Sequence, residues 1–181
     1  MTEGNTVRAV FDHLRLTLEK EIPRQLEHPE GGHYVVALLI VIGSEALSKL
    51  QGQPDEHLFV KMTTQRGLTS LMASTLFNAL RNGLAHLYDT KYIKAGVLMI
   101  ELSVSWRLKR HLSVRRDPPC LYLNARTMWE DLQAELVRLA DTLPAGGALP
   151  PEWRKGSIQS ADHDAAAWRK WIATQEEGAG Q

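Results

Sequence analysis

The sequence predicts a mainly α-helical protein, a bundle of four to five helices with one inserted β-hairpin. Long segments place apolar residues at helical spacing, and a single short segment alternates apolar and polar residues instead. The composition is that of an ordinary globular chain, with 44% hydrophobic and 23% charged residues among 181. A chain of this length buries a useful core without a metal or disulfide. We expect one domain over residues 1–143 and a C-terminal tail over residues 144–181.

Charge and cysteine content narrow the classes of function. Lys plus Arg equals Asp plus Glu, at 21 each, so no overall charge points to nucleic acid or to a membrane surface. Cys120 is the single cysteine, which excludes an internal disulfide and favours a cytoplasmic protein. Its place in a strand-like run favours a buried packing residue over a reactive thiol. The longest apolar run, 34–42, has about half the length of a membrane span, so we expect a core helix and no membrane association.

The first two helices follow from capping and periodicity. Thr6 can cap a helix that runs to about Glu21, and Pro23 is expected to end or bend it. A second helix is predicted over 33–50. Its first half is apolar all round, so it should lie centrally in the bundle. A short helix over 56–62 is a candidate third element.

A further long helix, over about residues 67–88, separates two kinds of side chain. At about 100° per residue, one sector collects the apolar residues that should face the core: Ala73, Leu76, Phe77, Leu80, Leu84 and Leu87. Asn78, Asn82 and His86 follow one another at i, i+4 and i+8 on the opposite side. Arg81 and Tyr88 share a neighbouring stripe.

The inserted hairpin is predicted over about residues 97–123. Residues 97–104 alternate as a strand does, and residues 121–123 form a second short strand that we expect to pair with it antiparallel. The segment between the strands holds the only dense basic cluster of the chain: Arg107, Lys109, Arg110, His111, Arg115 and Arg116. This cluster is either a solvated loop or a surface that tracks phosphates.

The last strong helix is predicted over 124–142, with Asn124 as its N-cap. The tail that follows is rich in Gly, Pro, Ser, Ala and Asp, with three tryptophans among them. A short helix over 162–175 is a candidate there, to pack on the main domain or on a partner.

Several common catalytic signatures do not occur in the sequence. It has no Gly-rich phosphate loop, no pair of Cys or His residues at zinc spacing, and no serine in a strand–turn–helix elbow. These absences argue against the usual dehydrogenases, kinases, metalloproteases and esterases. We therefore predict neither a cofactor nor a metal site.

The segment from Phe77 to Tyr88, FNALRNGLAHLY, resembles the signature of the HEPN superfamily. In that family an arginine, usually followed by a polar residue, precedes a histidine by four to six positions near the end of a helix. Arg81, Asn82 and His86 match this pattern, and Tyr88 completes the longer R-x4-H-x-Y form of HEPN toxins that pair with minimal nucleotidyltransferases. The resemblance covers residues 6–143 and implies an up-and-down helical bundle. The compact toxins are shorter and all-helical, so the hairpin is a departure from the family.

The resemblance implies a metal-independent endoribonuclease of a toxin–antitoxin or phage-defence type, with its site shared between two protomers of a homodimer. His86 would serve as general acid or base, Arg81 would stabilise the phosphate, and Asn82 would orient either of them. Substrate RNA would meet Asn78, Tyr88 and the basic residues of the hairpin. Tyr88 is alternatively a packing residue. The competing hypotheses are a non-catalytic interaction module, with a regulatory or antitoxin partner, and a domain that binds nucleotides without cleaving them.

Overall fold

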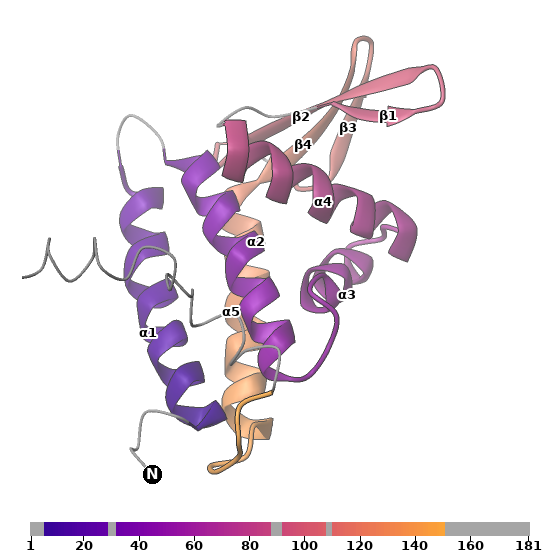
Figure 1. The fold of residues 1–181 in the computed structure, drawn as a ribbon. Coiled ribbons are helices and arrows are strands. Elements are labelled where there is room, and N and C mark those ends of the chain that lie inside the picture. The colour runs from indigo at the N-terminus through magenta and orange to yellow at the C-terminus, as the bar shows by residue number, and fades with distance from the viewer. Residues whose placement is uncertain (1–5, 29–31, 88–91, 108–109, 151–181) are drawn as a thin grey trace, which may run out of the picture. The chain divides into compact units, whose positions relative to one another are not determined.

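The computed structural model describes residues 6–28, 32–87, 92–107 and 110–150, with only the backbone described at 84–87. The chain divides into two units, Met1–Pro150 and Pro151–Gln181, and all the described residues belong to the first. The first unit is mainly helical, as expected, and also holds a small sheet (Figure 1). The elements in chain order are α1 (Val7–Leu26), α2 (His33–Leu50), α3 (His57–Gln65), α4 (Ser70–Leu87), β1 (Ile93–Ala95), β2 (Leu98–Ser105), β3 (Ser113–Arg116), β4 (Pro119–Asn124) and α5 (Ala125–Thr142).

Helix α1 begins where its cap predicts and runs past its proline. The Thr6 hydroxyl accepts a hydrogen bond from the Ala9 amide at 3.2 Å, which confirms the cap. The helix continues through Pro23 to Leu26, so the expectation that Pro23 ends it is wrong. A proline in the last turn removes only one helical hydrogen bond. Ile22 and Leu26 on either side of it are buried, and this burial holds the final turn in place.

Helices α1, α2 and α5 form the main bundle (Figure 1). The α1 and α2 helices are consecutive and antiparallel, as in an up-and-down bundle. At the start of α1, Arg8 Nη1 donates to the Ala140 carbonyl near the end of α5, so α1 and α5 are also antiparallel. It follows that α2 and α5 run parallel, because the sheet segment carries the chain back to the top of the bundle before α5 begins.

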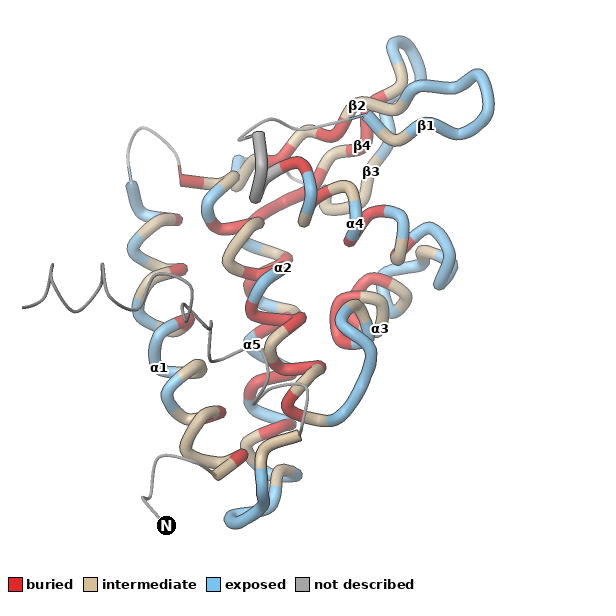
Figure 2. Tube along the Cα trace, viewed as in Figure 1, coloured by how far each residue is buried: buried red, intermediate tan, exposed pale blue. Residues whose placement is uncertain are grey.

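Helix α2 contacts every other helix of the described chain, which confirms its central position. Its buried residues include Val36, Ile40 and Leu47, but Val35 and Ile42 are exposed, so the apolar first half is not covered on all sides (Figure 2). By length and composition α2 is also a weak candidate for a membrane span. Slightly more than half of the helix, 56%, is buried inside the protein, as in the core helix of a bundle.

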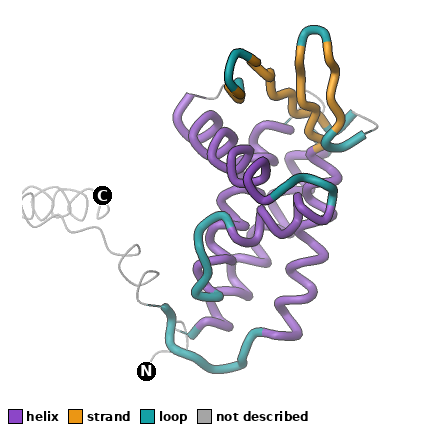
Figure 3. Tube along the Cα trace, turned by 90° about the vertical axis from the view of Figure 1, so that its right-hand side faces the viewer, coloured by secondary structure: helices purple, strands orange, loops and turns teal. Residues whose placement is uncertain are grey.

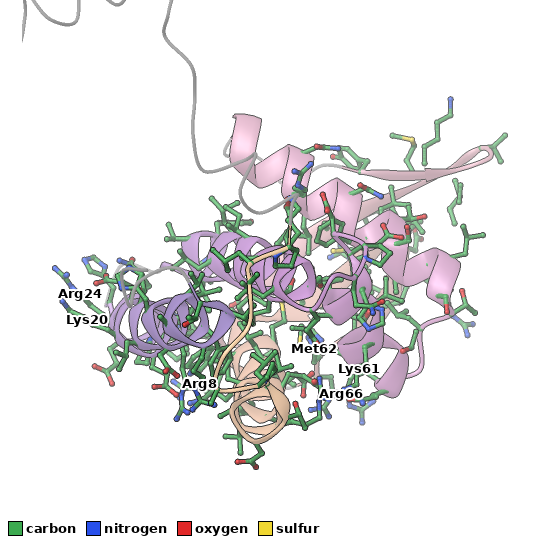
Figure 4. All side chains as sticks on the ribbon, turned by 60° about the horizontal axis from the view of Figure 1, so that its bottom comes forward. Arg8, Lys20, Arg24, Lys61, Met62 and Arg66 are labelled. Atoms are coloured by element: carbon green, nitrogen blue, oxygen red, sulfur yellow. The ribbon has the colours of Figure 1, made fainter. Side chains whose placement is uncertain are left out.

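Helices α3 and α4 pack on the side of α2 away from α1, and α3 is tied to α5 by ion pairs. Lys61 donates to the Glu135 carboxylate at 2.8 Å, and Arg66 forms a two-bond pair with Asp131. Lys61 and Arg66 both reach from α3 toward α5 (Figure 4). The α4 core face is confirmed where side chains are described: Ala73, Leu76, Phe77 and Leu80 are buried.

The inserted segment is a four-stranded sheet and not a single hairpin. Its strand order is β1-β2-β4-β3, and its strands lie together at one end of the helices (Figure 3). The expected antiparallel pairing of the two predicted strands is wrong, because β2 and β4 are parallel, with Leu102 beside Leu121 and Val104 beside Leu123. Each of them belongs to its own antiparallel hairpin, with β1 and β3 respectively. The β1–β2 turn uses Gly96, whose φ of 63° lies in the left-handed region that glycine tolerates.

The junctions of α5 complete the unit. Asn124 ends β4 and caps α5, since its Oδ1 accepts from the amides of Arg126 and Thr127 at 2.9 and 3.1 Å. After α5, Gly147 accepts a hydrogen bond from the Val7 amide, so residues that we expected in the tail join the helical unit. The candidate helix over 162–175 lies outside the described residues.

Candidate functional site

Arg81 lies in the second half of α4 and is held by a carboxylate from α2. Its Nε donates to Glu45 Oε2 at 2.7 Å and its Nη2 donates to Glu45 Oε1 at 3.1 Å. This is the planar two-bond geometry for which a guanidinium is suited. The Arg81 side chain is still 43% exposed, and within the described chain its Nη1 has no protein partner. The Glu45 contact thus fixes the guanidinium while part of its donor edge stays open to solvent.

Glu45 is the centre of this cluster. Its side chain is only 12% exposed and also receives Lys49 Nζ at 2.6 Å. Burial alone would raise the Glu45 pKa, but the hydrogen bonds from Arg81 and Lys49 outweigh it and hold the pKa below its ordinary value. Lys49 in turn lies 3.4 Å from Asp55. The two cations and two carboxylates of this cluster therefore nearly cancel.

The other motif residues are placed by α4 only in part. Asn78 and Asn82 are exposed, on the face that the helical spacing predicts. The Asn78 side-chain amide donates to the Ser74 carbonyl at 3.0 Å and so lies along its own helix. His86 belongs to the last turn of α4, one turn beyond Asn82, but its side chain is not described. Tyr88 lies outside the described residues.

The basic residues of the predicted loop do not form one cluster. Because β2 and β4 are parallel, both hairpin turns lie at one end of the sheet, with Arg115 and Arg116 next to the second turn. Arg107 and Arg110 follow the opposite end of β2 and are exposed. Lys109, like Tyr88, falls outside the described residues. The cluster of the sequence is thus divided between the two ends of the sheet.

Arg107 lies close to the first turn of α2. Its guanidinium is 4.9 Å from the Trp106 ring centroid, a cation–π contact. Burial lowers the pKa of His33, and the charge of Arg107 lowers it further. His33 Nδ1 is buried and has no hydrogen-bond partner within the described residues.

His111, the remaining residue of the basic segment, has a structural role. Its Nδ1 accepts a hydrogen bond from the backbone amide of Asn124 at 3.1 Å, directly before α5. Burial lowers the His111 pKa to about 4, while the weaker charge effects of Asp131 and Arg66 raise and lower it respectively. The imidazole is therefore neutral at pH 7 and acts as an acceptor. Cys120 is also buried, and burial and Glu101 raise the pKa of its thiol, as expected of a packing residue.

The sequence pattern did not reveal that Glu45 belongs to the site. The i,i+4 spacing of Glu45 and Lys49 predicts the pair between them, but not the bond to Arg81. A signal was present, because Glu45 is the single carboxylate of a predominantly apolar helix. Buried carboxylates require a partner, and the partner here comes from another helix.

The described residues contain no group of three or more His, Cys, Asp or Glu side chains placed to hold a metal ion. Comparisons with protein-family models, curated proteins and solved structures found no match. The resemblance to the HEPN superfamily accordingly stays a prediction from the sequence.

Proposed function

We propose that this chain is a HEPN-type, metal-independent endoribonuclease with its reactive groups at the C-terminal end of α4. The observation that carries the proposal is the state of Arg81, which Glu45 holds in a fixed orientation while no described residue is a partner of its Nη1. A pre-oriented guanidinium stabilises a phosphate that gains charge without reorganising during the reaction. Arg81 stands five residues before His86, so both belong to the last two turns of one helix.

The chemistry needs one proton acceptor and one proton donor. The 2′-oxygen of a ribose attacks the adjacent phosphorus as a base removes its proton. The bond from phosphorus to the 5′-oxygen then breaks, and an acid protonates that oxygen. The products are a 2′,3′-cyclic phosphate and a 5′-hydroxyl. His86 supplies an imidazole that titrates near neutral pH for one of these roles.

A homodimer would supply the second imidazole and additional positive charge. Glu45 and Asp55 offset Lys49 and Arg81 within one chain, so the phosphate backbone gains little attraction there. The exposed Arg107 and Arg110, which follow the C-terminal end of β2, are candidates to guide RNA, with Lys109 between them in sequence. Two protomers that bring their α4 ends together would combine two imidazoles with the basic residues of both chains. An activity of this kind fits a toxin–antitoxin or phage-defence protein.

The test is incubation of purified protein with structured and unstructured RNA in EDTA, beside His86→Ala and His13→Ala. His13 is exposed on α1 and serves as the matched control. We expect the parent and His13→Ala to cleave, leaving 2′,3′-cyclic phosphate ends. His86→Ala should lose about 100-fold or more in rate, the usual contribution of an acid or base. Equal rates from the parent and His86→Ala, or ends of another kind, would refute the proposed mechanism.

A second candidate is a non-catalytic interaction module. The Arg81–Glu45 pair favours it, because a buried carboxylate on α2 accounts for an arginine on α4 without any ligand. In this case a folded parent protein would cleave no RNA in EDTA or in Mg²⁺.

A further inference from the structure

A groove on the opposite half of α4 is not used by the proposed reaction. It has a volume of about 320 Å³ and lies between the first turns of α4 and one face of the sheet. Leu71, Met72 and Thr75 line it from the helix, and Ile93, Ile100 and Val114 from three of the strands. Leu112 also lines it, with φ of 54°, a conformation that residues other than glycine rarely adopt. The groove therefore runs across the sheet beside α4.

Much of the exposed apolar surface of the described chain lies on the elements that form this groove, and Leu71, Met72 and Val114 line it. Eleven large hydrophobic residues are exposed in the described chain. Seven of them belong to the start of α4 or to the sheet segment: Leu71, Met72, Tyr92, Val97, Leu98, Met99 and Val114. Leu71 is 79% exposed and Val114 is 61% exposed. Apolar surface concentrated in this way on a soluble domain marks an interaction site more often than scattered single residues do. The remaining four exposed residues are spread over α1, α2 and α5.

Lys94, on the edge strand β1, is the one charged residue among the described residues that line the groove. Arg116 stands two residues after Val114 on β3, so its side chain leaves the same face of the sheet. Both are exposed, and neither is in an ion pair with another described residue. The residues that line the groove include no Asp or Glu. An occupant with apolar side chains below and carboxylates along its flank is complementary to this surface.

The dimensions favour a short helix as that occupant. The groove is lined by all four strands, through Ile93, Ile100, Leu121 and Val114. Adjacent strands are about 4.8 Å apart, so the four span about 14 Å. A helix of about ten residues has this length at 1.5 Å per residue. Such a helix would lie beside α4 and continue the layer of helices that covers this face of the sheet.

We propose that the groove binds an amphipathic acidic helix of a partner protein. Apolar residues at i, i+3 or i+4, and i+7 of that helix enter the groove, and its Asp or Glu residues face Lys94 and Arg116. This is the helix-in-groove mode of peptide recognition. The site is separate from the Arg81–Glu45 pair, so its occupancy does not depend on the proposed ribonuclease activity.

The probe for this proposal is a displayed library of random, helix-forming peptides of about 14 residues, panned against the full chain. Enriched peptides are then measured by fluorescence anisotropy on the parent and on Leu71→Glu, Lys94→Glu and Val137→Glu. Leu71 is almost fully exposed, so its replacement leaves the core intact. Val137, 57% exposed on α5, is the matched control for a new surface carboxylate.

We expect enriched peptides to carry the apolar spacing with acidic flanks. Leu71→Glu should weaken their binding by about tenfold or more, as for a central contact, while Val137→Glu should change it less than about twofold. Lys94→Glu should weaken binding by several-fold and reduce its salt dependence. The proposal is overturned if no peptide of this pattern is recovered or if Leu71→Glu binds the peptides as the parent does. A parent dimer, seen by light scattering, that Leu71→Glu dissociates would also overturn it, because the occupant would then be a second copy of this chain.

Discussion

At the scale of single residues, the position of Arg81 depends on Glu45. We expect Glu45→Ala to lower the free energy of unfolding by about 2 kcal/mol, less than the loss of a fully buried pair, because Arg81 and Lys49 are partly exposed and can hydrate. Urea denaturation measures this value. Glu19→Ala is the control, since Glu19 forms an i,i+4 pair with Arg15 in which both side chains are about one-third exposed. Its cost should stay below about 0.5 kcal/mol, and equal costs at the two positions would show that Glu45 has no special role.

The lowered pKa of His111 makes the stability of the folded chain depend on pH. Its pKa is lowered from 6.5 to about 4 in the folded chain, so the unfolded chain binds its proton more readily. The stability that neutral His111 contributes is present above pH 6.5 and is lost as the pH falls from 6.5 toward 4. We expect the parent to lose about 2 kcal/mol between pH 7.5 and pH 5 from this group. The pH range from 7.5 to 5 lies above the lowered pKa values of Glu45 and Glu135. The stability that these two carboxylates contribute is lost only at more acidic pH.

The variant His111→Gln isolates this effect. A glutamine oxygen can accept the Asn124 amide as the imidazole Nδ1 does, but it has no proton to gain in this range. Denaturation curves of His111→Gln should therefore depend much less on pH between 7.5 and 5 than those of the parent, and the dependence that remains comes from His33, whose pKa is also lowered. An unchanged pH dependence would assign the effect to other groups.

At the scale of elements, the close approach of α1 and α2 depends on Gly43. A Cβ built there would lie 3.0 and 3.1 Å from the two terminal carbons of Leu18. Gly43→Ala adds helix propensity of about 1 kcal/mol and needs only a small shift of a flexible side chain, so we expect little net change in stability. Gly43→Leu has no such room and should destabilise by about 1–3 kcal/mol through overpacking. Thermal unfolding of both variants checks this, and a stable Gly43→Leu would contradict the packing described.

The cap of α5 offers a second test at this scale. Asn124→Ala removes the acceptor of two amide donors at the point where β4 becomes α5. We expect a loss of about 1–2 kcal/mol in the free energy of unfolding. Asn124→Asp keeps an acceptor and should recover most of it. Equal losses for both variants would mean that the side chain stabilises the junction in another way.

The elements were predictable to the extent that local patterns determine them. The bounds of α2 and the caps at Thr6 and Asn124 follow from sequence, because burial of one face and capping act over a few residues. Strand β3 was missed because its four residues, Ser113 to Arg116, hold one apolar side chain and two arginines. Without β3, the two recognised strands read as a single hairpin. The parallel pairing of β2 and β4 depends on contacts between segments far apart in the sequence, which a local pattern of residues does not contain.

At the scale of the whole molecule, the site is an assembly of segments far apart in sequence. Arg81 and the asparagines of α4 could be predicted as site residues from one segment of sequence. Helical spacing alone places the asparagines on the face away from the core and Arg81 on a neighbouring stripe. The bond between Arg81 and Glu45 spans 36 residues and depends on how α2 and α4 cross, which no local pattern states. The division of the basic residues between the two ends of the sheet has the same origin, since it follows from the parallel β2–β4 pairing.

The measurement that tests the central claim most directly is the rate of RNA cleavage in EDTA by the parent, Arg81→Ala and Arg15→Ala. Each protein is first shown to be folded at the assay temperature, because Arg81→Ala leaves Glu45 with Lys49 as its remaining cation. If Arg81 stabilises the phosphate in the transition state, Arg81→Ala should lose about 100-fold or more in rate, while Arg15→Ala, on the exposed side of α1, keeps the parent rate. Cleavage by folded Arg81→Ala at the parent rate would contradict the account and remove the end of α4 from the reaction.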